Sequence, residues 1–439
     1  MRVRESNLSC MTDNKRSTQG RFARLRSSLA LGAARLATTA SKATGRGAGG
    51  MIGGLVAGAI DPNIMDTVAA GRPAVLVTGT NGKSTTTNML ASALRSKYTV
   101  ATNDGGDNMD AGIISALLAG KDASHIVLEV DELHVPHVAR RLQPEAIVLL
   151  NLTRDQLDRV GEITKIERAL RAAVEANPQA TIVANCDDVL ITSIAYDHPK
   201  VVWVAAGAGW TGDSVTNPRS GGHIVRTEDD WFAVEPLEDG REFRRPTPSY
   251  SVDADGLHTP ERTVELSLQL PGRANRGNAT QAVACAVEAF GVSVEDAVAA
   301  AEGVNNVAGR YTTAHLGGRE VHFLLAKNPA GWQEALTMLD TDAAGIVIAV
   351  NSQQGDGEDV SWLWDITFDN FAAIPVKASG ERATDLAVRL LYGGVKNELI
   401  HDPVAAIRAC PPGRVEVLAN YTALLNLRRA LAKEEDYRA

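Results

Sequence analysis

The stretch with the clearest chemical potential is Gly-Thr-Asn-Gly-Lys-Ser at residues 79–84, between an apolar run and a helical pattern. A strand, a glycine-bracketed turn and a helix opening on Lys-Ser form the arrangement in which proteins hold nucleotide phosphates. Backbone N–H groups can converge on phosphate oxygens, Lys83 can neutralise them, and Ser84 can ligate Mg²⁺. We therefore expect ATP or GTP to contact Gly79, Thr80, Asn81, Gly82, Lys83, Ser84 and Thr85.

A second group of candidate residues lies at the end of the largely apolar run 125–130. It consists of three acids, at positions 129, 131 and 132. In open α/β sheets ligands bind at the carboxyl ends of the strands, so an acid emerging beside the phosphate loop is placed to hold Mg²⁺. Glu129 is our candidate for this ligand. The alternative is a solvated acidic strand end.

The pattern of strands and helices that must position these residues predicts an α/β protein, and the chain length predicts more than one domain. A chain of 439 residues exceeds what one hydrophobic core usually covers. We expect a basic flexible arm at 1–45, a central P-loop domain with a parallel sheet at 46–308, and a C-terminal Rossmann-like α/β domain at 309–439. Short strand patterns at 201–270 predict a β-rich insertion or sheet extension. Clean alternation of strands and helices after 309, including a helix around Trp362, predicts a parallel, doubly wound domain.

Charge and composition limit the possible partners. The net charge of −9 argues against nucleic acid, although the first 50 residues hold ten Lys and Arg against two acids. We interpret this arm as a disordered start plus a docking helix, with contact to anionic lipid as the alternative. The apolar run at 29–36 is broken by Arg35, and the run at 51–60 is too short to span a bilayer, so no signal peptide or transmembrane segment is expected. Four separated cysteines without a C-x-x-C pair indicate reduced thiols and a cytoplasmic protein, or one at the inner membrane face.

Several motifs together resemble the Mur ligase family: the short GTNGK[ST] loop, the strand ending at Glu129, and the Asn-x-Asp-Asp turn at 185–188. The resemblance implies that Glu129 ligates magnesium and that Asn275 and Asn278 contribute to adenine binding. It also implies that Arg310, in a Gly-Arg-Tyr sequence at the domain hinge, reaches the ATP phosphates. A helix start capped by asparagine is the alternative account of the Asn pair. Gln156 stands where these ligases carry a histidine that helps to hold a second magnesium ion. The resemblance therefore does not decide whether a second magnesium ion binds.

Within this family, residues 151–163, 324–336 and 351–370 are similar to the MurT subunits of lipid II isoglutaminyl synthases. This resemblance implies ATP-dependent amidation of the α-carboxylate of D-glutamate in the lipid II stem peptide through an acyl phosphate. Lys83 and Asp356 are then the catalytic residues, because Asp356 matches the aspartate that family members require. A glycine-containing surface turn at 356–359 is the alternative. Leu324 replaces the aspartate that contacts the nucleotide ribose in amino-acid-adding relatives.

The cysteines also bear on the source of ammonia. A glutaminase needs a cysteine nucleophile, usually on a glycine-flanked elbow, and the four contexts LSCMT, ANCDD, VACAV and RACPP contain none. The resemblance therefore implies a GatD-like glutamine amidotransferase as partner. Some relatives carry a four-cysteine zinc ribbon in the central domain, whereas residues 201–270 contain no cysteine, so no structural zinc is expected.

Two other functions compete with this one. The first is a Mur-type amino-acid-adding ligase or a folylpolyglutamate synthase, against which the sequence LLAKNP at 324–329 and the acidic C-terminal cluster count. The second is a nucleotide-binding regulator without activity, which would not need an intact set of Lys83, Ser84 and Glu129.

Overall fold

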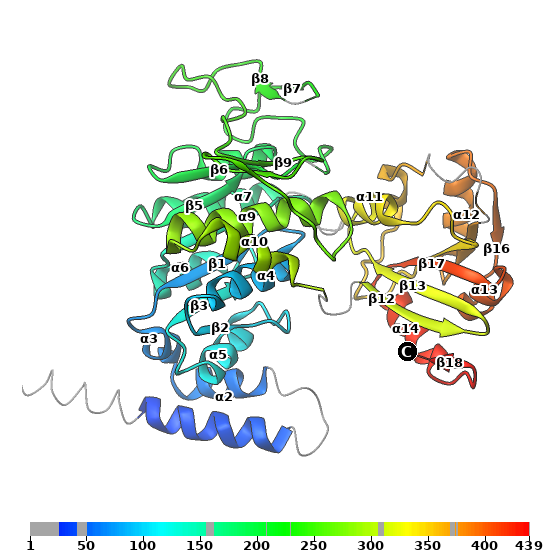
Figure 1. The fold of residues 1–439 in the computed structure, drawn as a ribbon, viewed down its shortest axis with the longest axis horizontal. Coiled ribbons are helices and arrows are strands. Elements are labelled where there is room, and N and C mark those ends of the chain that lie inside the picture. The colour runs from blue at the N-terminus through cyan, green and yellow to red at the C-terminus, as the bar shows by residue number, and fades with distance from the viewer. Residues whose placement is uncertain are drawn as a thin grey trace, which may run out of the picture.

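The computed structural model describes residues 26–41, 51–154, 162–207, 209–228, 230–305, 311–368, 374 and 376–438. Figure 1 shows two α/β lobes side by side, each built on a sheet covered by helices. Both sheets consist mainly of parallel strands. The predicted α/β fold is confirmed.

The central domain contains a nine-stranded sheet. Seven strands run parallel, in the spatial order β2 (Val100–Thr102), β3 (His125–Glu129), β1 (Ala74–Thr78), β4 (Ala146–Leu149), β5 (Thr181–Asn185), β6 (Val201–Ala205) and β9 (Tyr250–Val252). The sheet continues with two short antiparallel strands, β10 (Leu257–His258) and β11 (Thr263–Val264). The P-loop strand β1 therefore lies inside the sheet, with neighbours on both sides.

Helices cover both faces of this sheet (Figure 1). One layer consists of α4 (Lys83–Arg95), α9 (Arg273–Phe290) and α10 (Val294–Glu302). The other consists of α2 (Ile52–Ile60), α3 (Ile64–Ala69), α5 (Asp110–Ala119), α6 (Val135–Leu142), α7 (Glu162–Glu175) and α8 (Val189–Ala195).

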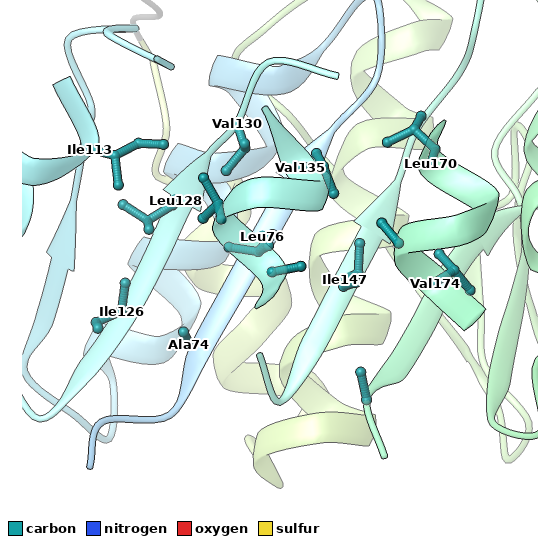
Figure 2. Packing of buried hydrophobic residues seen from close by; sticks show 14 of the residues in the cluster. Ala74, Leu76, Ile113, Ile126, Leu128, Val130, Val135, Ile147, Leu170 and Val174 are labelled. Atoms are coloured by element: carbon teal, nitrogen blue, oxygen red, sulfur yellow. The ribbon is translucent and has the colours of Figure 1, made fainter. Parts of the chain in front are cut away.

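The strand residues separate into two cores because successive side chains point to opposite faces. Leu76 of β1 belongs to the cluster shown in Figure 2, where it lies near Val135 of α6, while Ile147 of β4 lies near Val174 of α7. Val75 and Val77 belong to the opposite cluster, with residues of α4 and α9. Burial on both faces explains why β1 reads as a continuous apolar run.

The predicted β-rich stretch divides into two structures. Its first strand, β6, joins the main sheet, and β9 to β11 extend it. Between them, β7 (Ile224–Arg226) and β8 (Trp231–Ala233) form a separate antiparallel hairpin with a small core around Trp231 and Phe243. The sequence predicted an insertion or a sheet extension, and the structure contains both.

The C-terminal domain has a seven-stranded sheet. Five strands run parallel, in the order β16 (Asn397–Leu399), β15 (Val376–Ser379), β14 (Gly345–Ala349), β17 (Gly413–Ala419) and β13 (Arg319–Leu325). The sheet ends in the antiparallel strands β12 (Tyr311–Leu316) and β18 (Tyr437–Arg438). Its helices are α11 (Pro329–Met338), α12 (Ala383–Tyr392), α13 (Pro403–Ala409) and α14 (Tyr421–Leu431).

Two expectations for this domain were wrong in part. The sheet is not wholly parallel, because Gly317 and Gly318, at φ 53° and 79°, form a tight turn between β12 and β13. Two glycines with positive φ favour a hairpin, and a hairpin joins antiparallel strands. Where a helix was expected around Trp362, the chain forms the short 3₁₀ segment η1 (Ser361–Asp365), and Trp362 packs on Trp332 at 5.2 Å between ring centroids.

Residues 26–41 form a helix that packs outside α2. Ser27 Oγ donates to Asp61 Oδ2 at 2.6 Å and Arg26 Nε donates to the carbonyl of Ile60 at 2.6 Å. This agrees with the docking helix expected in the basic arm, while residues 1–25 and 42–50 lie outside the described residues. The boundaries at 45/46 and 308/309 stay predictions, since both fall within stretches that the structure does not describe. None of the helices in the described part of the chain is long and apolar enough to cross a bilayer.

The contact between α2 and α5 depends on a missing side chain. A Cβ on Gly54 would lie 1.8 Å from the carbonyl oxygen of Ala111, while one on Gly58 would meet nothing closer than Ile114 Cδ1 at 3.4 Å. We expect Gly54→Ala to lower the free energy of unfolding by about 1–3 kcal/mol, because the two helices must separate. Urea denaturation of this variant and of Gly58→Ala measures the difference. Equal stability of the two variants would contradict this account of the packing.

Candidate active site

The P-loop connects β1 to α4 and depends on two glycines. Gly79 and Gly82 have φ values of 141° and 85°, which side-chain-bearing residues rarely adopt. A Cβ on Gly79 would lie 2.9 Å from the carbonyl oxygen of Asn151, and one on Gly82 would lie 2.5 Å from Oδ1 of Asn278. Both glycines are therefore required by backbone conformation and by close packing.

Asn151, two residues after β4, holds the loop in place. Its Oδ1 accepts the N–H of Asn81 at 2.9 Å, its Nδ2 donates to the carbonyl of Asn81 at 2.9 Å, and its own carbonyl accepts the N–H of Thr80 at 2.9 Å. The N–H groups of Thr80 and Asn81 thus point at Asn151, contrary to the expectation that they open toward phosphate. The N–H groups that a phosphate could use are those in the first turn of α4, which begins at Lys83. These groups have no partner within the helix.

The side chain of Lys83 folds back across this loop. Its Nζ donates to the carbonyl of Gly79 at 2.5 Å and forms an ion pair with Glu132 Oε2 at 3.2 Å. Both side chains are only about one-tenth exposed, at 11% and 10%. Burial raises the pKa of Glu132, and the ammonium of Lys83 opposes that rise. Glu132 is therefore the counterion of Lys83 in the structure, a role that a phosphate can take over.

Ser84 and Glu129 lie together as expected for metal ligands. Ser84 Oγ donates to Glu129 Oε2 at 2.6 Å, and Asn108 Nδ2 donates to Oε1 of the same carboxylate at 2.9 Å. The side-chain amide of Asn103 bonds both the N–H and the carbonyl of Glu129 at 2.8 Å. The carboxylate, buried at 4% exposure, is thus held at the carboxyl end of β3.

These two oxygens fit Mg²⁺, which takes oxygen ligands and usually keeps phosphate and water among them. No group of three or more His, Cys, Asp or Glu side chains is arranged to hold a metal within the described ranges. A magnesium ion here would therefore take Ser84 and Glu129 from the protein and its other ligands from nucleotide and water. The expected absence of zinc stays a prediction.

The two asparagines of α9 lie beside the P-loop. The side chain of Asn278 packs directly against Gly82, and its Nδ2 donates to Asn275 Oδ1 at 3.4 Å. Asn275 Nδ2 donates to the carbonyl of Pro271 at 2.6 Å. The N-cap position is occupied by Gly272, with no side-chain cap, so the alternative of a capping asparagine is wrong. Their contact with adenine stays a prediction.

The C-terminal domain reaches the same loop through α11. Asn328, the N-cap of α11, exchanges side-chain hydrogen bonds with Asn81 at 3.2 Å in both directions. Glu334 of α11 accepts the N–H of Ala274 at the start of α9, at 3.0 Å. These contacts bring the carboxyl edge of the C-terminal sheet against the P-loop. Leu324, in β13, is buried at 3% exposure in the C-terminal core.

Asp356 follows β14 on that edge. Its Oδ1 accepts the N–H of Thr422 at 2.9 Å, its Oδ2 accepts the Thr422 hydroxyl, and Oδ2 also accepts the N–H of Gln353 at 3.4 Å. The carboxylate thus accepts hydrogen bonds from the first turn of α14. The turn that carries Asp356 is therefore fixed to this helix. These bonds stay within the C-terminal domain, and none joins Asp356 to Lys83. Arg310 and Gln156 lie outside the described residues.

Sequence reasoning did not assign three residues of this site: Asn151, Asn328 and Glu132. Asn151 and Asn328 stand inside the stretches 151–163 and 324–336 that carried the family resemblance, which was the available signal. Glu132 was one of the three acids after β3. Only the fold shows which of these acids faces Lys83.

Comparison with known proteins identifies two domains in order. Residues 77–286 match the family described as the Mur ligase middle domain, and residues 325–424 match the MurT ligase C-terminal family. A curated relative, subunit MurT of lipid II isoglutaminyl synthase (glutamine-hydrolyzing) from Streptococcus pneumoniae, is 29% identical over 420 residues, 89% of this chain and 94% of the relative. The subunit of the same name from Staphylococcus aureus strain COL is 27% identical over 388 residues, 84% of this chain and 88% of the relative.

Solved structures share the fold. A pseudomurein peptide ligase type C from Methanothermus fervidus aligns with a TM-score of 0.65 at 17% identity, covering 85% of this chain and 81% of the other. MurF ligase from Thermotoga maritima in complex with ADP aligns with a TM-score of 0.53 at 18% identity, covering 84% and 83%. The resemblance found in the sequence is confirmed: this chain is a ligase that joins a Mur ligase middle domain to a MurT ligase C-terminal domain, and it is similar to MurT subunits over most of its length.

Proposed function

We propose that this chain is the ATP-dependent subunit of a lipid II isoglutaminyl synthase and acts in peptidoglycan synthesis. It amidates the α-carboxylate of D-glutamate in the lipid II stem peptide to D-isoglutamine. The observation that carries the proposal is a P-loop with Lys83 and an adjoining Ser84–Glu129 pair, contacted directly by a C-terminal domain of the MurT type. The ADP complex of the MurF neighbour and the names of the curated relatives support it.

Activation of the substrate is the first step. A carboxylate is a poor electrophile, so one of its oxygens attacks the γ-phosphorus of ATP, giving an acyl phosphate and ADP. Lys83, released from Glu132, neutralises the phosphate oxygens, and Arg310 is proposed to assist. Magnesium bound between Ser84 and Glu129 would supply further positive charge during this transfer.

Amide formation is the second step. Ammonia attacks the acyl carbon, the C–O bond to phosphate breaks, and inorganic phosphate leaves while the nitrogen loses a proton. We assign to Asp356 the role of receiving ammonium or taking that proton. An ionised carboxylate offers roughly four acceptor sites, and three donors from Thr422 and Gln353 hold this one in a fixed direction. The remaining acceptor site is available to the nitrogen.

The cysteines support an external source of ammonia. A nucleophilic cysteine must be a thiolate, and burial raises the pKa of Cys186 to about 12 and also raises that of Cys285 and Cys410. These three thiols are buried, and Cys10 lies outside the described residues. A separate GatD-like glutamine amidotransferase is therefore our proposed partner, in keeping with the word subunit in the relatives' names.

One assay tests the proposed reaction. The full chain is incubated with ATP, Mg²⁺, lipid II and ammonium chloride, with and without a co-purified glutaminase. We expect lipid II-dependent ADP release and, by mass spectrometry, conversion of one carboxyl to an amide. Replacing ammonium by amino acids tests the amino-acid-adding alternative. Incorporation of an amino acid, or no ADP release that depends on lipid II, would defeat the proposal.

Asp356→Asn is expected to retain ATP binding and to abolish amidation, because the amide cannot take a proton yet still accepts hydrogen bonds from the first turn of α14. Thr422→Val is the matched control, since it removes one of the bonds that hold Asp356 but leaves the carboxylate. ATP affinity by calorimetry and amidation rates are compared for both variants. Wild-type turnover in Asp356→Asn, or an equal loss in Thr422→Val, would remove Asp356 from the chemistry.

Glu132→Gln is expected to tighten ATP binding by about tenfold, equivalent to about 1.4 kcal/mol, because phosphate then no longer competes with a buried counterion for Lys83. Lys83→Ala is expected to weaken ATP binding. Asp131→Asn, which removes a neighbouring charge without touching Lys83, serves as the control. Titration calorimetry with ATP and Mg²⁺ measures all three, and unchanged or weaker binding by Glu132→Gln would contradict the competing-counterion account.

A further inference from the structure

The helix at 26–41 forms the outermost layer of the central domain, beyond α2 and α5 (Figure 1). Its inner side is buried at Ser27, Ala30 and Ala34. Its outer side carries Leu29 and Leu36, seven residues apart and hence on the same side of the helix, which are 62% and 75% exposed. Two large apolar side chains are therefore displayed where a soluble surface helix normally carries polar ones.

The neighbouring helix α2 is also apolar. Its sequence, IGGLVAGAI, contains no charged residue. Leu55 is 58% exposed, and Met51 and Ile52 are also exposed. We call Leu29 and Leu36 the N-terminal apolar surface.

The sequence of this segment carries charge of one sign. Residues 14–60 contain eight basic residues and no Asp or Glu, in a chain whose net charge is −9. Two of them, Arg26 and Arg35, are exposed on the helix that carries Leu29 and Leu36. The basic residues of this segment are Lys15, Arg16, Arg21, Arg24, Arg26, Arg35, Lys42 and Arg46.

We infer that the N-terminal apolar surface seats the protein on an anionic lipid bilayer. Leucines on one side of a helix with arginines beside them match the boundary between acyl chains and charged headgroups, and basic residues are attracted to anionic lipid. Nucleic acid would meet the arginines but leave the leucines without a partner. The helix lies on the bilayer rather than crossing it, in agreement with the absence of a spanning helix among the described residues.

Direct packing connects the N-terminal apolar surface to the proposed metal site. α2 packs on α5 through Gly54, whose N–H donates to Ser115 Oγ at 2.8 Å. Asn108, two residues before α5, binds Glu129. A protein seated in this way would meet a lipid-linked substrate at the membrane. That consequence rests on the proposed function, whereas binding to lipid does not.

Vesicle flotation of the full chain tests the inference. We expect binding to vesicles of equal parts phosphatidylcholine and phosphatidylglycerol, and little binding to phosphatidylcholine alone. Leu29→Ser with Leu36→Ser should weaken binding by about tenfold or more, and Arg35→Glu should weaken it at low salt. Leu391→Ser with Leu399→Ser, which changes two exposed leucines of the C-terminal domain, is the matched control and should bind as the wild type does. Circular dichroism checks that each variant is folded.

Three outcomes would overturn the inference: a wild-type chain that ignores anionic vesicles, leucine variants that bind as the wild type does, or variants that change only the oligomeric state. The last would assign the surface to contact between proteins. Amidation of a lipid-free acceptor is measured in parallel, and the leucine variants should retain it. Loss of vesicle binding with retained amidation leaves the proposed function standing, and vesicle binding without any amidation defeats the proposed function alone.

Discussion

The close packing of the P-loop is the constraint on which the rest of the site depends. Gly79 and Gly82 allow Asn151 and Asn278 to approach the backbone from two sides, at distances that leave no room for a Cβ. Asn81 meets Asn328 from the other domain on a third side. Three segments far apart in the sequence thus fix one short loop, so its geometry depends on the correct assembly of both domains.

The second constraint is the pairing of buried charge. Lys83 is held by backbone carbonyls and by Glu132, and the Glu129 carboxylate is held by Ser84 and Asn108. An unpaired charge at such positions would cost several kcal/mol, so each group needs a partner before substrates arrive. In the proposed function, phosphate would take the place of Glu132 beside Lys83, and magnesium would bind the Glu129 carboxylate together with Ser84.

The sequence could predict those parts of the fold and site whose interacting residues lie close together along the chain, and it could not predict contacts between residues far apart in the sequence. The order of β1, loop and α4 is encoded locally, and so is the position of Glu129 at a strand end; the structure confirms the pairing of Ser84 with Glu129. The clamps at Asn151 and Asn328 join residues 70 and 247 positions apart, which no local pattern specifies. The hairpin at Gly317 and Gly318 had a local signal that the strand–helix alternation obscured. The choice of Glu132 over Asp131 as the partner of Lys83 depends on how the chain turns after β3.

The interface between the domains explains how a site divided in this way can work. The contacts through Asn328 and Glu334 both come from α11, and Asp365 adds an ion pair with Arg154 at 3.5 Å. These contacts are polar, as is common between domains of one chain. The hydrogen bonds of Asp356, in contrast, lie within the C-terminal domain, so its orientation does not depend on the contacts that fix the P-loop. In the proposed function, the residue assigned to ammonia and the residues assigned to phosphate are therefore positioned independently of each other.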